Sequence, residues 1–264
     1  MNKNSFILKL NSVGKYFLAE AGMKVNVLED INFEIPVSSE GTITSILAPF
    51  GSGKSTLLKI ISGVIERDRG EIFFGDSQIN NKNIIPLIPE KPSSFPWLSV
   101  RQNIKFGLNL TENKKYNLDN LIALVGLAAY SDHYPDNKSC GFRFRISLAR
   151  AMALNPSLIL IDDSFKQMDI ESREEIYKLI YDLSSSEKLN FIIATTNLVE
   201  AIQLSDLIFL MSAKPGKIVH RIETGGKYSP EMRNLKSEKF SSFKSEIEEA
   251  FQSVHSLKTI NYSV

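Results

Sequence analysis

A glycine-rich loop, APFGSGKST, occupies residues 48–56, between a short apolar run and a segment with helical spacing. Backbone N–H groups in such a loop, and at the start of the helix after it, point toward a bound anion. Gly51 and Gly53 let the backbone approach phosphate oxygens with no Cβ in the way. Lys54 would reach the β and γ phosphates of a nucleoside triphosphate, and Ser55 would place its hydroxyl on magnesium. The predicted nucleotide-binding residues of this loop are Phe50, Gly51, Ser52, Gly53, Lys54, Ser55 and Thr56.

The loop departs from the pattern G-x-x-x-x-G-K-[ST] at its first position, where Ala48 replaces glycine. That position mainly shapes the turn, so alanine is a mild departure. A glycine-rich turn with a solvated lysine is the alternative interpretation. The strand expected before the loop and the helix expected after it favour nucleotide binding.

Two acids follow a buried apolar run in the stretch LILIDDSFKQMD, residues 158–169. Asp162 ends the expected strand, where a carboxylate could hold magnesium directly or through water. Asp163 supplies a second carboxylate that could activate an attacking water. On its own, Asp162 would more simply be a helix cap or a solvated strand end. The phosphate loop upstream favours the metal site.

Short apolar runs alternate with segments of helical spacing through most of the chain. This alternation is typical of a parallel sheet covered by helices on both faces. The sequence therefore predicts an α/β fold with a P-loop NTPase core: a mainly parallel sheet with flanking helices, antiparallel N-terminal strands and a helical subdomain insertion. The expected strands cover residues 6–13, 27–35, 42–48, 71–76, 157–162, 191–196, 207–213 and 217–223, and the expected helices cover 56–64, 100–108, 118–127, 146–154 and 173–183.

Bulk properties narrow the class of protein. The chain has 264 residues, a formal net charge of +1 and one cysteine, Cys140. The near-zero charge argues against overall electrostatic binding of nucleic acid, and a single cysteine fits a reducing compartment. No apolar stretch approaches the roughly 20 residues of a transmembrane helix, and the N-terminus lacks the apolar core of a secretory signal. A cytosolic location is expected, with any membrane link made through a partner.

The stretch SCGFRFRISLARAM, residues 139–152, resembles the signature sequence and following helix of the nucleotide-binding subunits of ABC transporters. The resemblance covers nearly the whole chain, with the motifs in the expected order. It implies that Ser139, Cys140 and Gly141 contact the γ-phosphate of a nucleotide held by the opposite subunit. Cys140 stands where glycine is usual and adds a side chain at a point of close approach. A plain turn before a helix and a redox thiol are the alternative interpretations.

Several other positions receive roles only through this resemblance. Glu90 replaces the glutamine that normally touches magnesium and the attacking water, and Thr196 replaces the histidine that contacts the γ-phosphate. Asp163 replaces the usual glutamate. Asp169 matches an aspartate of the family's nucleotide site, and Phe17 stands where the family stacks an aromatic ring on adenine. A solvated loop acid and ordinary core packing are the alternatives for Glu90 and Phe17.

The phosphate-binding parts are therefore kept, whereas the parts that orient water and sense the γ-phosphate are altered. Asp163 is one methylene shorter than glutamate, and a misplacement of about 1 Å can cost roughly a hundredfold in rate. A threonine cannot carry the positive charge that a histidine can. The sequence predicts ATP and Mg²⁺ as cofactors with slow hydrolysis. The expected catalytic residues are Asp163, Lys54, Glu90 and Thr196, and the expected metal ligands are Ser55, Asp162 and Glu90.

The segment PWLSV and the tail resemble, more narrowly, the ATPases of nitrate, sulfonate and taurine importers. This implies a subunit that energises the import of a small anion, as one of a head-to-tail pair on two transmembrane permease subunits. It would be peripheral on the inner face of the cell membrane, with its coupling groove around residues 94–106. The alternative is a catalytically degenerate regulatory subunit that pairs with an active ABC ATPase. Action on ribosomes or DNA is disfavoured by the near-zero charge, so no nucleic-acid partner is expected.

The expected organisation is a single ABC ATPase domain over residues 1–264. Residues 1–93 and 138–226 form its nucleotide-binding core, and residues 94–137 form the helical subdomain. Residues 227–264 form a polar C-terminal extension with one amphipathic stretch, FSSFKSEIEEAF.

Overall fold

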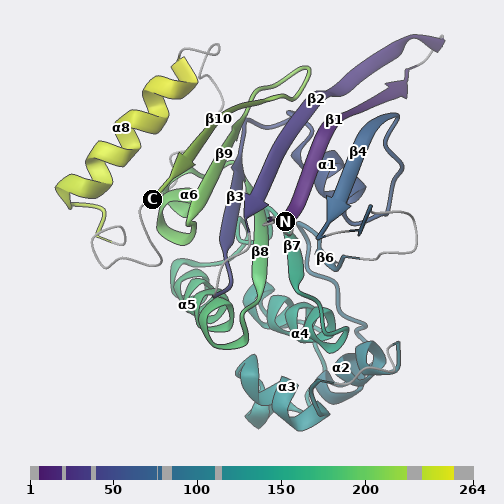
Figure 1. Ribbon diagram of the computed structural model, residues 1–264. Helices are drawn as coiled ribbons and strands as arrows, with labels where there is room; N and C mark the ends of the chain where they lie inside the picture. Colours follow the sequence, from purple (N-terminus) through teal and green to yellow (C-terminus); the bar gives the residue numbers. More distant parts are fainter. Residues whose placement is uncertain are drawn as a thin grey trace, which may run out of the picture.

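The computed structural model describes residues 6–19, 22–36, 40–75, 77–78, 85–110, 115–224 and 234–252. Its strands form two sheets (Figure 1). A four-stranded antiparallel sheet has the order β2-β1-β4-β5, and a six-stranded sheet has the order β10-β9-β3-β8-β7-β6. In the second sheet all neighbours are parallel except β10 and β9. The strands are β1 (Phe6–Leu18), β2 (Lys24–Pro36), β3 (Ile43–Leu47), β4 (Arg69–Phe74), β5 (Ser77–Gln78), β6 (Leu87–Ile88), β7 (Leu158–Asp162), β8 (Asn190–Thr195), β9 (Leu207–Met211) and β10 (Ile218–Glu223).

The helices are α1 (Lys54–Ile61), α2 (Val100–Leu108), α3 (Leu118–Leu124), α4 (Cys140–Ala153), α5 (Ile170–Glu187), α6 (Leu198–Leu204) and α8 (Glu238–Gln252), with a 3-10 helix η2 (Ala128–Tyr130). Helices α2 to α6 each begin after a polar side chain that accepts a backbone N–H of the first turn. Such caps satisfy N–H groups that have no partner inside the helix, so the sequence fixes where these helices start. The capping residues are Ser99, Asn117, Ser139, Asp169 and Asn197.

The six-stranded sheet is covered on both faces. One apolar core lies between the two sheets and includes Leu57 of α1, Leu8 of β1 and Leu160 of β7. A second core, on the other face, includes Phe144 of α4 and Ile176 of α5. Figure 1 shows α1 on the side of β1 and β4, and α4 and α5 on the opposite side. The predicted α/β fold with a mainly parallel sheet and antiparallel N-terminal strands is confirmed.

The helices α2 and α3 lie at one end of the molecule, against α4 (Figure 1). Their apolar residues Ile104 and Leu121 belong to the same core as Phe144. The backbones of α2 and α4 are close, because a Cβ added to Gly107 would lie 2.8 Å from the carbonyl oxygen of Arg150. The helix predicted over residues 100–108 is therefore present, and the one predicted over 118–127 is present but ends at Leu124. Both are continuous with the main core.

Some predicted boundaries need correction. The strands expected over residues 6–13 and 27–35 are longer, because β1 and β2 pair along a hairpin that extends to Leu18 and Lys24. Helix α1 ends at Ile61, so Val64, the last residue of the helix expected over residues 56–64, lies outside it and is 67 % exposed. The short elements β6 and α6 were not expected, since they carry too few residues for a clear period. Glu20 and Ala21, in the expected hairpin turn, lie outside the described residues.

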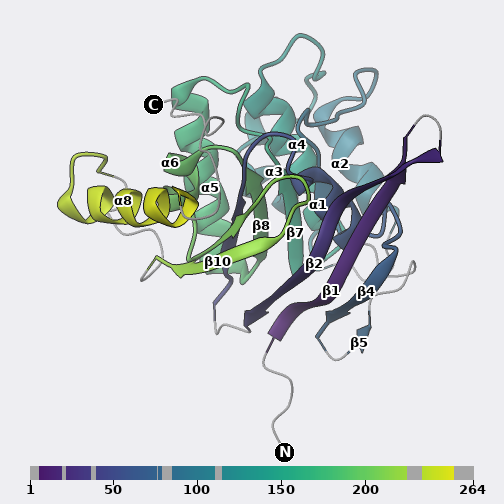
Figure 2. The same ribbon diagram turned by 90° about the horizontal axis from the view of Figure 1, so that it is seen from above.

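The C-terminal helix α8 packs on α6 at the edge of the molecule (Figure 2). It buries Phe240 and Ile247 against apolar residues of α6, β9 and β10. The amphipathic stretch predicted in the extension is thus a docked helix. Residues 225–233 and 253–264, with His255, lie outside the described residues. Within the part of the chain that the structure describes, no helix has both the length and the apolarity to cross a bilayer.

Candidate functional site

The carboxyl ends of four parallel strands meet at one edge of the six-stranded sheet. Leu47, at the end of β3, is paired with Thr195 of β8, and Asp162, at the end of β7, is paired with Ala194 of β8. Strand β6 pairs in parallel with β7. Segments that follow such strand ends emerge side by side, which is where open parallel sheets bind ligands. The predicted residues that follow these strands are the phosphate loop, Thr196, Asp163 and Glu90.

Lys54 is folded back over the loop that carries it. Its Nζ donates to the carbonyl oxygens of Ala48 at 2.9 Å and of Pro49 at 3.0 Å. Burial lowers the pKa of the Lys54 ammonium to about 8, although Asp163 and Asp162 act in the opposite direction. An anion placed beside this ammonium would stabilise its charged form.

The two glycines of the loop have different surroundings. Gly53 precedes α1 with φ at 96°, and an added Cβ would lie 2.9 Å from side-chain atoms of both Val27 and Leu28. Gly51 has φ at 74°, and an added Cβ would have no atom within 4 Å. No side chain caps α1. The loop therefore packs on β2 at Gly53 and is open at Gly51, with the first N–H groups of α1 available to an anion.

Ser55 and Asp162, the two predicted metal ligands, lie together beside the loop. The Ser55 hydroxyl donates to Oδ1 of Asp162 at 3.0 Å. Burial raises the pKa of the Asp162 carboxyl, partly offset by the hydrogen bond from Ser55 and the charge of Lys54. The described residues hold no cluster of three or more His, Cys, Asp or Glu side chains that could bind a metal alone. Mg²⁺ needs only one or two protein oxygens when substrate phosphates and water complete its shell, so this pair fits that ion.

Asp163 and Thr196 flank the same edge. Asp163 has left-handed backbone geometry, with φ at 48°, and its N–H donates to the carbonyl of Ala194 at 2.8 Å. Burial raises the pKa of its carboxyl, against the lowering effects of Lys54 and Lys166. Thr196 follows β8 and is buried. Besides Ser55 and Asp162, the edge thus presents the carboxylate of Asp163 and the hydroxyl of Thr196.

Glu90 is exposed in the segment after β6. It follows β6, which pairs in parallel with β7, so it lies at the same edge as Asp162 and Asp163, and its charge raises the pKa of both carboxyls. In the described structure, no hydrogen bond joins it to Ser55 or Asp162. The segment is held by Ser164, whose hydroxyl donates to the Pro89 carbonyl at 2.8 Å. Glu90 is therefore near the site, but its predicted role as a metal ligand stays a prediction.

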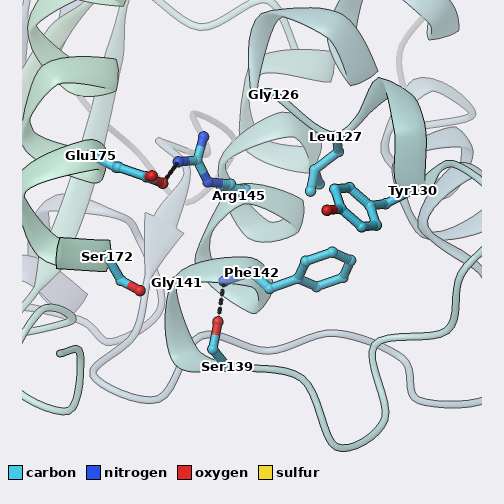
Figure 3. A pocket seen from close by; sticks show the side chains of 9 residues that line it. All are labelled: Gly126, Leu127, Tyr130, Ser139, Gly141, Phe142, Arg145, Ser172 and Glu175. Carbon is cyan, nitrogen blue, oxygen red and sulfur yellow. Dashed lines mark hydrogen bonds and ion pairs between the residues drawn. The ribbon is translucent and has the colours of Figure 1, made fainter.

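The predicted signature residues lie at the start of α4. The Ser139 hydroxyl accepts the N–H of Phe142 at 3.2 Å. A pocket of about 250 Å³ lies beside this helix end, and Figure 3 shows the side chains that line it. Arg145 closes one side of it by donating to Val125 at 2.9 Å and to Glu175 at 2.8 Å. The residues that line the pocket are Gly126, Leu127, Tyr130, Ser139, Gly141, Phe142, Arg145, Ser172 and Glu175.

Cys140 stands at the start of α4, and Asp169 caps the start of α5. The Cys140 thiol lies 3.9 Å from Oε1 of Gln167 and accepts from Arg143 at 3.4 Å. Asp169 accepts the N–H and the hydroxyl of Ser172, each at 2.8 Å, and these bonds lower the pKa of its carboxyl. Among the described residues, no hydrogen bond or ion pair ties the signature residues or Asp169 to the phosphate loop of their own chain.

Two aromatic side chains predicted at the nucleotide are exposed. Phe17, on β1, is 44 % exposed, with the Lys15 ammonium 5.4 Å from its ring centroid. Phe50, in the phosphate loop, is 77 % exposed. The packing alternative for Phe17 does not describe its surroundings, because nearly half of the side chain faces solvent. Stacking of Phe17 on adenine stays a prediction.

Two residues near the site were missed by the sequence analysis. Lys166 is exposed in the turn three positions after Asp163, and no local pattern marks it in the sequence. Glu200, on α6, is buried and accepts from the Tyr177 hydroxyl at 2.9 Å. Its other oxygen, Oε1, has no hydrogen-bond partner among the described residues. Nothing in the sequence distinguishes Glu200 from an exposed helical glutamate.

Comparison with known proteins places the chain among ABC proteins. The family model described as "ABC transporter" matches residues 28–166. The chain is 33 % identical to an aliphatic sulfonates import ATP-binding protein of Bacillus thuringiensis subsp. konkukian, over 93 % of this chain and 96 % of that protein.

Solved structures share the fold. The structure of cbiO1 from Clostridium perfringens, part of the ABC transporter complex cbiONQ, superposes with a TM-score of 0.72 at 22 % identity, over 95 % of this chain and all of the other. A dimeric ATP-binding cassette bound to ADP and phosphate, MJ0796, gives 0.69 at 22 % identity over 83 % of this chain and 99 % of that one. The chain therefore belongs to the ABC transporter family and carries that family's ATP-binding domain.

Proposed function

We propose that the chain is the ATP-binding subunit of an importer for small anions of the sulfonate class. The observation that carries the proposal is the meeting of Lys54, Ser55 and Asp162 at one sheet edge, where the Ser55 hydroxyl and Oδ1 of Asp162 lie 3.0 Å apart. The cargo class rests on the name of the Bacillus thuringiensis relative, which describes import of aliphatic sulfonates. The transported molecule itself is chosen by other subunits.

ATP would bind along the phosphate loop, with its phosphates on the amides of residues 50–55 and on Lys54. Ser55 and Asp162 would hold Mg²⁺, and Phe17 would stack on the base. The bound ion would neutralise charge that develops on the phosphates during transfer. Lys54 already stands at the loop with a pKa of about 8, so phosphate binding would keep it charged.

Hydrolysis in this site would be slow. Asp163 carries the carboxylate that would activate the attacking water. Its side chain is one methylene shorter than that of glutamate, so it would hold this water less favourably. Thr196 can offer a hydroxyl to the γ-phosphate but no positive charge. Glu90 adds a negative charge near Asp162 and Asp163. Each change would weaken stabilisation of the transition state, whereas the expected phosphate-binding residues Lys54 and Ser55 are kept.

The subunit would work as one of a head-to-tail pair, with the signature residues Ser139, Cys140 and Gly141 facing the nucleotide of the other subunit. Among the described residues, no hydrogen bond or ion pair joins them to the phosphate loop of the same chain, in agreement with this arrangement. Residues 1–93 and 138–226 would act as the nucleotide-binding core, and residues 94–137 as the helical subdomain. Residues 227–264 would form a C-terminal extension of the ATPase domain.

A permease would dock on residues 94–106. This segment carries an aromatic cluster in which the Phe95 ring centroid lies 5.7 Å from that of Trp97 and 5.2 Å from that of Phe106. Trp97 is 70 % exposed and Phe106 is 47 % exposed. Exposed apolar clusters of this kind mark interaction surfaces. Through such docking the subunit would sit on the inner face of the cell membrane.

Two measurements on the purified protein test the proposal. Mg-ATP binding is expected for the native chain and should be lost in Lys54→Ala. Steady-state turnover should be slow, and Asp163→Glu combined with Thr196→His should raise it at least about tenfold, since each restores a group that acts on the transition state. No measurable affinity for Mg-ATP would refute the binding function. Fast turnover of the native chain would refute the impairment.

A second candidate function is that of a regulatory subunit paired with an active ABC ATPase. It is favoured by the positions of the residues that differ from the family's usual motifs. Glu90, Asp163 and Thr196 follow strands at the catalytic edge, and Cys140 starts α4. The residues expected to bind phosphate and Mg²⁺ are kept, namely Lys54, Ser55 and Asp162. Isolation of the intact complex and identification of its chains would decide between the two, because a second ATPase chain in the complex supports the regulatory role.

A further inference from the structure

The segment between β6 and α2 is fastened to α4 at Ser93. The Ser93 carbonyl accepts from the Ser147 hydroxyl at 2.8 Å and from the Arg150 guanidinium at 2.7 Å. The same guanidinium nitrogen donates to the Ser93 hydroxyl at 3.1 Å, and the guanidinium carbon lies 5.0 Å from the centroid of the Phe95 ring. Hydrogen bonds from a charged donor are about twice as strong as neutral ones, so Arg150 supplies most of this fastening.

Asn103, on α2, holds the next part of the segment. Its side chain is fully buried, and its Oδ1 accepts the N–H of Phe95 at 2.8 Å. Its Nδ2 donates to the carbonyls of Phe95 at 3.0 Å and of Leu98 at 2.8 Å. Helix α2 itself packs closely on α4 at Gly107. The proposed permease dock, residues 94–106, is therefore held to α4 through both Ser93 and α2.

Ser93 lies between the dock and two predicted parts of the nucleotide site. Glu90 is three positions before it in the chain. Arg150 is on the helix that begins with the signature residues, ten positions after Cys140. At 1.5 Å per residue, these two positions are about 15 Å apart along α4. A displacement of the dock would thus be passed through Ser93 and Arg150 to the signature residues.

We propose that Arg150 is a positioning residue that makes the dock and α4 move as one body. The inference rests on the ATP hydrolysis and the permease dock proposed above. In the described part of the chain, no hydrogen bond or ion pair joins the Arg150 side chain to a residue predicted to bind nucleotide. Its loss should therefore lower turnover, because Glu90 and the signature residues would shift relative to each other, while Mg-ATP affinity is kept.

The fastening is tested by hydrogen exchange of the Phe95 amide in the purified chain. Exchange should be at least about tenfold faster in Arg150→Ala, because two charge-assisted hydrogen bonds that hold the segment are lost. Arg150→Lys keeps a cation that can donate to Ser93, so it should restore most of the protection. Ser147→Ala removes one neutral donor to the same carbonyl and should give a smaller change in the same direction. It also serves as the second variant if Arg150→Ala does not fold.

The positioning role is tested by separating chemistry from binding in the same variants. Single-turnover hydrolysis, with protein in excess over Mg-ATP, should be at least about tenfold slower in Arg150→Ala, and the dissociation constant for Mg-ATP should change by less than about twofold. The lysine variant should regain most of the rate. Arg101→Ala is the matched control, because the Arg101 guanidinium donates to Asp119 at 2.7 Å instead of to Ser93. It should leave exchange at Phe95 and turnover unchanged.

The outcomes separate the inference from the function on which it rests. Unchanged exchange at Phe95 in Arg150→Ala would overturn the fastening. Unchanged turnover, or a loss of Mg-ATP affinity as large as the loss of turnover, would overturn the positioning role, and so would a native chain that binds Mg-ATP without hydrolysing it. A native chain that binds no Mg-ATP would refute the proposed function itself, and the exchange measurement would then still decide the fastening alone.

Discussion

The Ser55 hydroxyl donates a hydrogen bond of 3.0 Å to Oδ1 of Asp162, although the two residues are 107 positions apart in the chain. One stands on the first turn of α1 and the other ends β7. The contact brings together the two oxygen atoms that are proposed to hold Mg²⁺. Burial raises the pKa of the Asp162 carboxyl, so a divalent cation beside it would favour its ionised form.

Asp162→Asn should therefore uncouple ATP binding from Mg²⁺. Asparagine keeps an oxygen that can accept from Ser55, so the fold should be retained, but it lacks the charge that holds the ion. In the native chain Mg²⁺ should tighten ATP binding, and in the variant most of that gain should vanish. ATP titrations with Mg²⁺ and with a chelator measure the gain. A variant that keeps the full effect of Mg²⁺ would show that Asp162 is not a metal ligand.

Gly53→Ala and Gly51→Ala should separate folding from binding. An added methyl at Gly53 meets Val27 and Leu28 at 2.9 Å in a left-handed backbone, so the free energy of unfolding should fall by about 1–3 kcal/mol. Gly51 is also left-handed but has open space around its added Cβ. Its variant should lose only about 1 kcal/mol, the cost of the backbone conformation.

Urea denaturation measures the two stabilities, and Mg-ATP titration measures binding. The Gly51 variant should fold well and still bind Mg-ATP poorly, because its methyl lies on the open side of the loop. Equal destabilisation of the two variants would contradict the packing of Gly53 on β2.

Ile247→Ala tests how firmly α8 is part of the domain. Ile247 is fully buried in a cluster with Leu198 and Ile202 of α6. Truncation of a buried isoleucine costs about 2–5 kcal/mol when the site cannot collapse. The exposed Ser245→Ala is the control on the same helix. If the unfolding midpoint stays unchanged in Ile247→Ala, α8 does not contribute to the stability of the domain.

Much of the site could be predicted from the sequence because its chemistry is local. The loop of residues 48–56 carries its own glycines, lysine and serine, and the acid pair Asp162 and Asp163 ends a continuous apolar run. Such runs are typical of buried parallel strands. The parallel order of those strands then brings the two motifs to one edge. Most core strands and helices were predicted for the same reason, because their apolar residues form continuous runs or recur with a clear helical period.

The residues that were missed depend on distant contacts. Glu200 has the local pattern of an ordinary helical glutamate, and only the packing of α6 on α5 buries it beside Tyr177. Lys166 has the local pattern of a solvated turn residue, and only the fold brings its charge close enough to lower the pKa of the Lys54 ammonium. Boundaries failed where tertiary pairing extends an element, as in the long β1–β2 hairpin.

Glu200→Gln should change how stability depends on pH. Burial raises the pKa of the Glu200 carboxyl from 4.5 to about 7, and Asp163 adds to this, while Thr195 and Tyr177 act against it. Between pH 4.5 and pH 7 the folded protein then holds a proton that the unfolded chain has released. The stability contributed by this group is therefore greatest at low pH and falls as pH rises toward 7.

The expected penalty from the shift of 4.5 to about 7 is about 3 kcal/mol above pH 7, taken at 1.36 kcal/mol per unit. Glutamine does not ionise and can still accept from the Tyr177 hydroxyl, so the variant should lack this penalty. Urea denaturation at pH 5, 6, 7 and 8 gives the stability difference between variant and native chain, which should grow in favour of the variant as pH rises. The exposed Glu174→Gln, on α5, is the control for loss of a solvated carboxylate. A difference that stays constant from pH 5 to 8 would mean that Glu200 ionises alike in the folded and unfolded states, and its burial would then need a compensating cation such as Arg173.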